Sequence, residues 1–141
     1  MFRVAKIKAK ARWVENIRSI VDNGRVHSVV CDSEVSSGGN DSGPSALELA
    51  LMALADCAVT IFADVAKQSK ITLTRMEVEA EAEKSPGSPK IGNVNLKVHI
   101  AGKARQALLE AAWRRTEAGC PVMEIFKNPI PVKIKLEIVP E

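Results

Sequence analysis

The sequence contains no tyrosine, three phenylalanines and two tryptophans, so few aromatic rings are present to stack on nucleic-acid bases. The net charge is only +3, and no run of five like charges occurs. Both shortages argue against a nucleic-acid-binding protein. The chain also has no uninterrupted apolar run of the ~20 residues that a membrane span needs. The opening MFRVAKIKAKARWV alternates basic and apolar residues, unlike a signal peptide. We therefore expect a cytoplasmic protein with neither a membrane nor a nucleic-acid partner.

Cysteine is scarce and irregularly placed. The three cysteines are Cys31, Cys57 and Cys120, an odd number without CxxC spacing, which argues against a disulfide framework and a zinc knuckle. A metal site built from Cys31, His27 and a third ligand is an alternative, but we prefer Cys31 as an ordinary strand residue. We expect no metal and no other cofactor. Cytoplasmic thiols stay reduced unless they are catalytic or redox-sensing.

The remaining composition is that of an ordinary globular protein. With 46% hydrophobic and 26% charged residues in 141 positions, the chain fits one domain covering residues 1–141. Alternation of apolar and polar residues predicts strands at 3–13, 17–21, 25–32, 76–83, 93–100 and 131–139.

The predicted strand 76–83 carries four glutamates on its outer face. Such a row repels itself unless basic residues lie beside it, and the candidates are Lys97, the Lys133/Lys135 strand and the N-terminal lysines. This charge pattern predicts one mainly antiparallel sheet that combines strands from both ends of the chain.

Helical periodicity dominates residues 45–69, where Ser45 and Glu48 fit a capping box. This segment is apolar nearly all round, so we expect it to be covered on most faces, in part by a second subunit. A second helix is predicted at 103–118, ended by Gly119, and a short third helix runs from Cys120-Pro121 to about Phe126. The predicted order is three strands, a helix, two strands, two helices and a strand.

Two of the cysteines are candidates for chemistry. In AGCPV, Pro121 favours the first helical position, which makes Cys120 the predicted N-cap. There the sulfur would face unpaired backbone N–H groups and the positive end of the helix dipole, a setting that lowers a thiol pKa. The alternative for Cys120 is a buried residue that suits a tight turn.

Cys57 lies in ALADCAVTIF, about three turns into the long helix, where the helix dipole no longer helps. Core packing is the alternative for this residue. If the tip of one helix brings Cys120 to Cys57, the two thiols have the arrangement that a nucleophile and a resolving partner need.

Several features together resemble the OsmC/Ohr family over nearly the whole chain: the long helix with its cysteine, the preceding GGNDSGPSALELALMALADC, the later AGCPV, and the order of the elements. The stretch GPSALELALMALADC is most similar to the YhfA-like branch. The resemblance implies an α+β fold of order βββαββααβ, with an antiparallel sheet and a long central helix, in an intertwined homodimer. It also implies a thiol peroxidase acting on organic hydroperoxides, with Cys57 peroxidatic, Cys120 resolving, and a dithiol as reductant.

The chain departs from the family where the first thiolate is activated. Family peroxidases carry a glutamate ten residues before the first cysteine, in an Asn-Pro-Glu run, and an arginine from the N-terminal loops. Here Leu47 occupies the glutamate position, and Glu48 follows about 100° further around the helix. The candidate arginines are Arg12, Arg18 and Arg25. We take Glu48 and Arg25 as the predicted supports of Cys57.

These departures keep a second hypothesis open. The protein would then be a non-catalytic dimer of the same fold, which binds a small apolar ligand in the interface cleft and retains its cysteines for packing.

Overall fold

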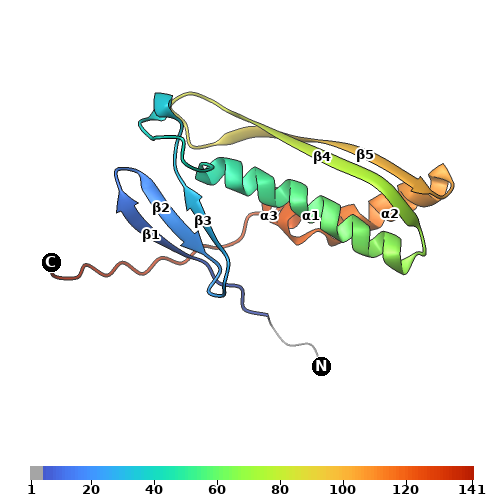
Figure 1. Ribbon diagram of the computed structural model, residues 1–141, viewed down its shortest axis with the longest axis horizontal. Helices are drawn as coiled ribbons and strands as arrows, with labels where there is room; N and C mark the ends of the chain where they lie inside the picture. The colour runs from blue at the N-terminus through green and yellow to red at the C-terminus, as the bar shows by residue number, and fades with distance from the viewer. Residues whose placement is uncertain (1–4) are drawn as a thin grey trace. The chain divides into compact units, whose positions relative to one another are not determined.

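The computed structural model describes residues 5–141 (Figure 1), so Arg3 and Val4 of the first predicted strand lie outside the described residues. The chain forms two compact units, Met1–Met52 and Ala53–Glu141, and the boundary between them falls inside the long helix. The elements in chain order are β1 (Lys10–Glu15), β2 (Arg18–Asp22), β3 (Ser28–Cys31), η1 (Val35–Ser37), α1 (Ala46–Gln68), β4 (Thr72–Lys84), β5 (Ile91–Lys103), α2 (Gln106–Gly119) and α3 (Pro121–Lys127). The mixed α+β class is confirmed.

The N-terminal unit holds a three-stranded antiparallel sheet in the order β1-β2-β3. The β1–β2 turn passes through Asn16, whose φ of 49° lies in the left-handed region that asparagine tolerates well. Strand β3 begins at Ser28, three residues later than predicted, because residues 23–27 form the loop between β2 and β3. The 3₁₀ helix η1 and the glycine-rich loop then lead into α1, whose first turns complete this unit.

The C-terminal unit is built on the long β4–β5 hairpin and three helices. Residues of α1 pack with β4, β5 and α2 around a buried cluster made of Phe62, Val65, Ala66, Ile71 and Ala112 (Figure 1). The predicted alternation is observed in both strands: the glutamates of β4 are exposed, and the apolar residues between them are half-buried. Glu79 stands opposite Lys97, as expected for the charge row, and Glu77 stands opposite His99.

Two predictions about the sheet were wrong. The described residues form two separate sheets, β1-β2-β3 and β4-β5, and not one sheet that combines both chain ends. The predicted strand 131–139 has no strand pairing, and its apolar side chains are exposed, Ile134 to 87% and Ile138 to 88%. An isolated segment cannot form a strand, because its backbone N–H and C=O groups need a neighbouring strand as partner.

The prediction that no segment approaches a membrane span was also wrong. Helix α1 has the length and apolar composition of such a span, with a mean hydropathy of 1.9 over an 18-residue window. One such helix is weak evidence for a membrane, because the core helix of a globular protein meets the same criterion. Six residues of α1 are buried, and they supply much of the core of the C-terminal unit.

Candidate functional site

Cys57 lies in the middle of α1 and is 8% exposed. The capping box at the start of this helix is formed: Ser45 N–H donates to Glu48 Oε1 at 3.0 Å, and Glu48 N–H donates to Ser45 Oγ at 3.2 Å. Within the C-terminal unit, Cys57 belongs to a small buried group that we call the thiol cluster, made of Leu54, Cys57, Cys120 and Met123. The structure therefore brings together the two cysteines that the sequence singled out.

Cys120 is the N-cap of α3, and Pro121 is its first helical residue, as predicted. The Cys120 side chain is 2% exposed and makes no capping hydrogen bond with its own helix, so the expectation that its sulfur would meet the free N–H groups there was wrong. Instead, the backbone N–H of Val122 in the first turn of α3 acts on the Cys57 thiol, whose pKa it lowers.

The environment of Cys57 favours the thiol over the thiolate. Burial is the main cause that raises the Cys57 pKa above its ordinary value, and the hydrogen bond shared with Cys120 raises it further. The Val122 N–H acts in the opposite direction, while the Asp56 carboxylate adds a smaller upward shift. A group that makes Cys57 reactive at neutral pH would have to add positive charge to this setting.

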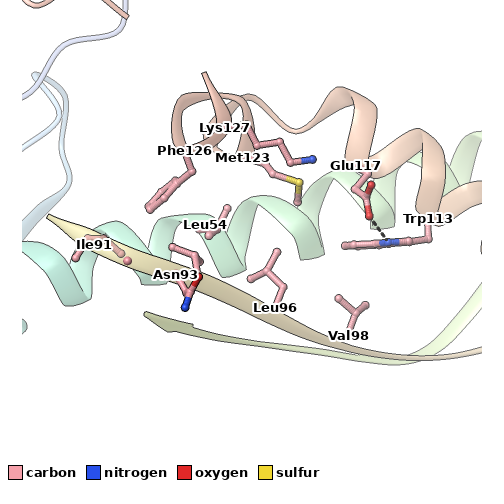
Figure 2. A pocket seen from close by; sticks show the side chains of 12 residues that line it. Leu54, Ile91, Asn93, Leu96, Val98, Trp113, Glu117, Met123, Phe126 and Lys127 are labelled. Atoms are coloured by element: carbon pink, nitrogen blue, oxygen red, sulfur yellow. Dashed lines mark hydrogen bonds between the residues drawn. The ribbon is translucent and has the colours of Figure 1, made fainter. Parts of the chain in front are cut away.

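An apolar cavity of about 710 Å³ lies beside the thiol cluster and shares two of its residues, Leu54 and Met123. Figure 2 shows Phe126 and Ile91 toward one end and Trp113 and Val98 toward the other. The rest of the wall comes from Gly92, Asn93, Val94, Leu96, Glu117 and Lys127. A cavity of this size and lining is typical of sites that hold a small organic molecule.

The polar side chains in the lining of this cavity are those of Asn93, Glu117 and Lys127, together with the indole N–H of Trp113. The indole Nε1–H of Trp113 donates to Glu117 Oε1 at 3.0 Å across one turn of α2, which fixes the ring against the cavity (Figure 2). Lys127 brings an ammonium group to the same lining. Sequence reasoning missed this cavity, because its walls are assembled from β5, α1, α2 and α3, and no local spacing reports such an assembly. The only local signal was the apolar pair Met123 and Phe126, which follows the Cys-Pro motif.

The other predicted site residues belong to the N-terminal unit. Glu48 is exposed and is held by Ser45, whose N–H and hydroxyl lower the Glu48 pKa. Arg25 lies in the β2–β3 loop, where its backbone N–H donates to Asn23 Oδ1 at 3.0 Å. Within residues 5–141, the Arg25 guanidinium forms neither an ion pair nor a hydrogen bond. Roles of Glu48 and Arg25 at Cys57 stay predictions.

Arg18, another candidate arginine, is engaged within the N-terminal unit. Its guanidinium contacts Glu15 Oε1 at 2.9 Å, Asn40 Oδ1 at 3.3 Å and Asp32 Oδ2 at 3.6 Å. These contacts join β2 to the glycine-rich loop.

Asp32 organises that loop and was not identified from the sequence. Its carboxylate is 3% exposed and accepts hydrogen bonds from the N–H groups of Ser33, Asn40 and Ser42 and from the Ser42 hydroxyl. These hydrogen bonds hold the Asp32 pKa far below its ordinary value, and the one from the Ser42 hydroxyl has the largest effect. The loop wraps so closely that a side chain at Gly39 would collide with the Ser33 carbonyl. Glycine in SSGGNDSG is therefore required by close approach.

A metal centre has no support within residues 5–141, where no group of three or more His, Cys, Asp or Glu side chains could hold an ion. Cys31 is buried at the end of β3, which agrees with its interpretation as a strand residue. His27 is placed by a contact of 3.1 Å between its Nδ1 and the Asn23 side-chain amide.

The comparisons with known proteins agree on one family. A family model described as OsmC-like protein matches residues 38–135. No curated protein matched the chain. Among solved structures, an OsmC-like protein from Mycoplasma pneumoniae aligns with a TM-score of 0.78 at 16% identity, covering 89% of each chain.

Two structures named for hydroperoxide resistance also align. The organic hydroperoxide resistance protein OsmC from Legionella pneumophila has a TM-score of 0.67 at 22% identity, covering 90% of this chain and 93% of that one. An organic hydroperoxide resistance protein from Elizabethkingia anophelis, with thiocyanate bound, has a TM-score of 0.63 at 18% identity, covering 92% and 93%. At these identities the likeness establishes the fold.

Proposed function

Because the chain belongs to the OsmC-like family, we propose that it is a thiol-dependent peroxidase that reduces organic hydroperoxides. Cys57 is the peroxidatic residue and Cys120 the resolving residue. The observation that carries this proposal is the contact between the two thiols in a buried cluster that adjoins an apolar cavity. Such a cavity suits the organic group of a hydroperoxide better than it suits hydrogen peroxide, which has no apolar part.

The reaction has two chemical steps in the protein. The Cys57 thiolate attacks the distal oxygen of the hydroperoxide, the O–O bond breaks, and the organic product leaves as an alcohol after its alkoxide takes up a proton. Cys57 is then a sulfenic acid. The Cys120 sulfur attacks the Cys57 sulfur, water leaves, and a disulfide forms. An external dithiol returns the disulfide to two thiols.

Formation of the thiolate is the demanding step, since burial raises the Cys57 pKa. The Val122 N–H already stabilises negative charge on that sulfur. We assign the additional positive charge to Arg25, oriented by Glu48, on the family resemblance. In support, the Arg25 guanidinium is not engaged with any other group of residues 5–141, whereas Arg18 is held by Asp32 and Glu15.

The working form is a homodimer in this proposal. The segment 130–139 exposes the apolar side chains Ile130, Val132, Ile134, Leu136, Ile138 and Val139. Such a row of exposed apolar residues marks an interaction surface, and its strand periodicity requires pairing with another strand. A second copy of the chain supplies an apolar surface to cover these side chains and a strand to pair with this segment. We place the protein in the cytoplasm, where dithiol reductants are present.

The raised pKa of Cys57 favours one alternative function. In that case the cysteines only pack, and the protein binds a small apolar ligand without reacting with it. The two functions differ in the reactivity of Cys57 at neutral pH, because a thiol with a raised pKa reacts slowly.

Turnover of cumene hydroperoxide by the purified protein with a dithiol reductant tests the proposal. The wild type is expected to reduce the hydroperoxide, Cys57→Ser to lose this activity, and the matched Cys31→Ser control to keep it. Activity that survives in Cys57→Ser would remove Cys57 from the mechanism. A folded wild type without turnover, together with slow alkylation of Cys57 at neutral pH, would favour the binding protein.

A further inference from the structure

Met123 occupies a position between the apolar cavity and the two thiols. Its side chain is one of the four members of the thiol cluster, and it also lines the cavity of about 710 Å³. Figure 2 shows the thioether extending from α3 into the space between this helix and β5. A molecule inside the cavity therefore meets the side chain of Met123, which packs with Cys57 and Cys120 in the thiol cluster.

We infer that Met123 is an oxidative modification site whose oxidant is an apolar hydroperoxide held in the cavity. The thioether sulfur attacks the distal oxygen of the hydroperoxide and becomes a sulfoxide. The O–O bond breaks, the hydroperoxide is reduced to its alcohol, and the hydroperoxide proton ends on the alcohol oxygen. Sulfur loses the two electrons that the peroxide gains, so no further reactant is needed.

Burial separates this site from ordinary surface oxidation. Within a single chain, Met123 is only 5% exposed, whereas Met52 on α1 is 55% exposed. A small, water-borne oxidant should therefore attack Met52 first, because access governs the rate. An apolar oxidant concentrated in the cavity reverses that order. The contrast between two methionines of one chain makes the inference measurable without a reference protein.

Oxidation of Met123 has a consequence for the thiols. A sulfoxide is polar, and it would stand among the apolar side chain of Leu54 and the buried sulfurs of Cys57 and Cys120. Burying an unpartnered polar group is unfavourable, so the contact of α3 with α1 is weakened. Because α3 carries both Cys120 and the Val122 N–H that contacts Cys57, the modification limits the thiol pair under prolonged peroxide exposure.

The inference rests on the part of the proposed function that admits an apolar hydroperoxide to the cavity, and not on thiol catalysis. The protein without added reductant is treated with cumene hydroperoxide or with hydrogen peroxide, and the sulfoxide at each methionine is followed over time by peptide mass spectrometry. With cumene hydroperoxide we expect Met123 to be oxidised severalfold faster than Met52, and with hydrogen peroxide Met52 to be faster. Excess 2-phenyl-2-propanol, the unreactive alcohol product, should slow oxidation of Met123 and leave Met52 unchanged.

Two variants make the result decisive. Cys57→Ser removes the proposed peroxidatic thiol and should still gain the sulfoxide at Met123. We expect cumene hydroperoxide to lower the melting temperature of Cys57→Ser. The same variant with Met123→Leu added, which keeps a similar side-chain volume, should show no such drop. Oxidation of Met52 ahead of Met123 by both peroxides, or no slowing by the alcohol, would overturn the inference. Turnover without Met123 oxidation refutes this inference alone, whereas Met123 oxidation without turnover refutes thiol catalysis alone.

Discussion

Cys57, in the middle of α1, lies in one buried cluster with Cys120, the residue that precedes the first turn of α3. The Val122 N–H from that same turn lowers the Cys57 pKa, in opposition to the upward shift that burial causes. One helix therefore brings both a second thiol and a hydrogen-bond donor to the candidate nucleophile.

Replacing Cys120 by serine should separate the two steps of the proposed reaction. The sulfenic acid formed at Cys57 can then no longer be resolved within the chain, so it should accumulate after one equivalent of hydroperoxide. Trapping with dimedone and mass spectrometry should find the adduct on Cys57 in Cys120→Ser, and a Cys57–Cys120 disulfide in the wild type. Cys31→Ser is the control and should behave like the wild type. A disulfide between Cys57 and Cys31 in the variant would contradict the assignment.

The raised Cys57 pKa makes stability depend on pH in a definite direction. Between the unfolded thiol pKa, ~8.5, and the higher folded value, the native state holds a proton that the unfolded state has lost. Stability contributed by this thiol is therefore complete below that range and is lost as pH rises through it. Thermal melting from about pH 7 to about pH 10 should fall more steeply for the wild type than for Cys57→Ser. Parallel curves, or a shallower fall for the wild type, would show that positive charge such as that of Arg25 offsets the upward shift of the Cys57 pKa, as the peroxidase requires and the binding protein does not.

The pH dependence of stability that Asp32 contributes has the opposite sign, because the hydrogen-bond donors around it lower its pKa in the folded state. Its contribution is present above the unfolded carboxyl pKa, ~3.9, and disappears as pH falls through the lower folded value. Asp32→Asn should lower the melting temperature by several degrees at neutral pH, and the difference from the wild type should shrink in acid. The exposed neighbour Asp41→Asn is the control. Equal effects of the two substitutions would rule out the special role of Asp32.

Phe62 is fully buried at the centre of the C-terminal unit. Phe62→Ala should therefore destabilise the protein by about 3–5 kcal/mol, since it removes apolar contact area and leaves a cavity. The matched control is Phe126, which is 37% exposed. Phe126→Ala should lower the free energy of unfolding clearly less than Phe62→Ala does. Urea unfolding followed by circular dichroism gives both values. Similar losses would mean that Phe62 is not a core residue.

The exposed C-terminal segment tests the proposed homodimer. Ile134→Asp places a charge on its apolar face, whereas Lys133→Ser changes the other face of the same predicted strand. Size-exclusion chromatography with light scattering should give a dimer for the wild type and for Lys133→Ser, and a shift toward monomer for Ile134→Asp. A monomeric wild type would refute the dimer.

Short-range patterns determined most of the secondary structure. The helix of Ala46–Gln68 was predicted to within a residue at each end, because its capping box and apolar periodicity are local properties. The alternation in β4 and β5 also fixed which side chains face outward. The same alternation failed at residues 131–139, since a strand needs a pairing partner and the chain alone provides none there.

The sequence by itself placed Cys57 within the long helix and the start of the third helix at Pro121, because helical spacing and proline placement act within a few residues. The pairing of Cys57 with Cys120 was implied by the resemblance to the OsmC/Ohr family. Only the tertiary structure decided that Cys57 and Cys120 lie in one buried cluster, and that Met123 belongs both to this cluster and to the wall of a cavity. Those relationships depend on how α1, β5, α2 and α3 pack, and packing is set by many weak contacts between residues far apart in the chain.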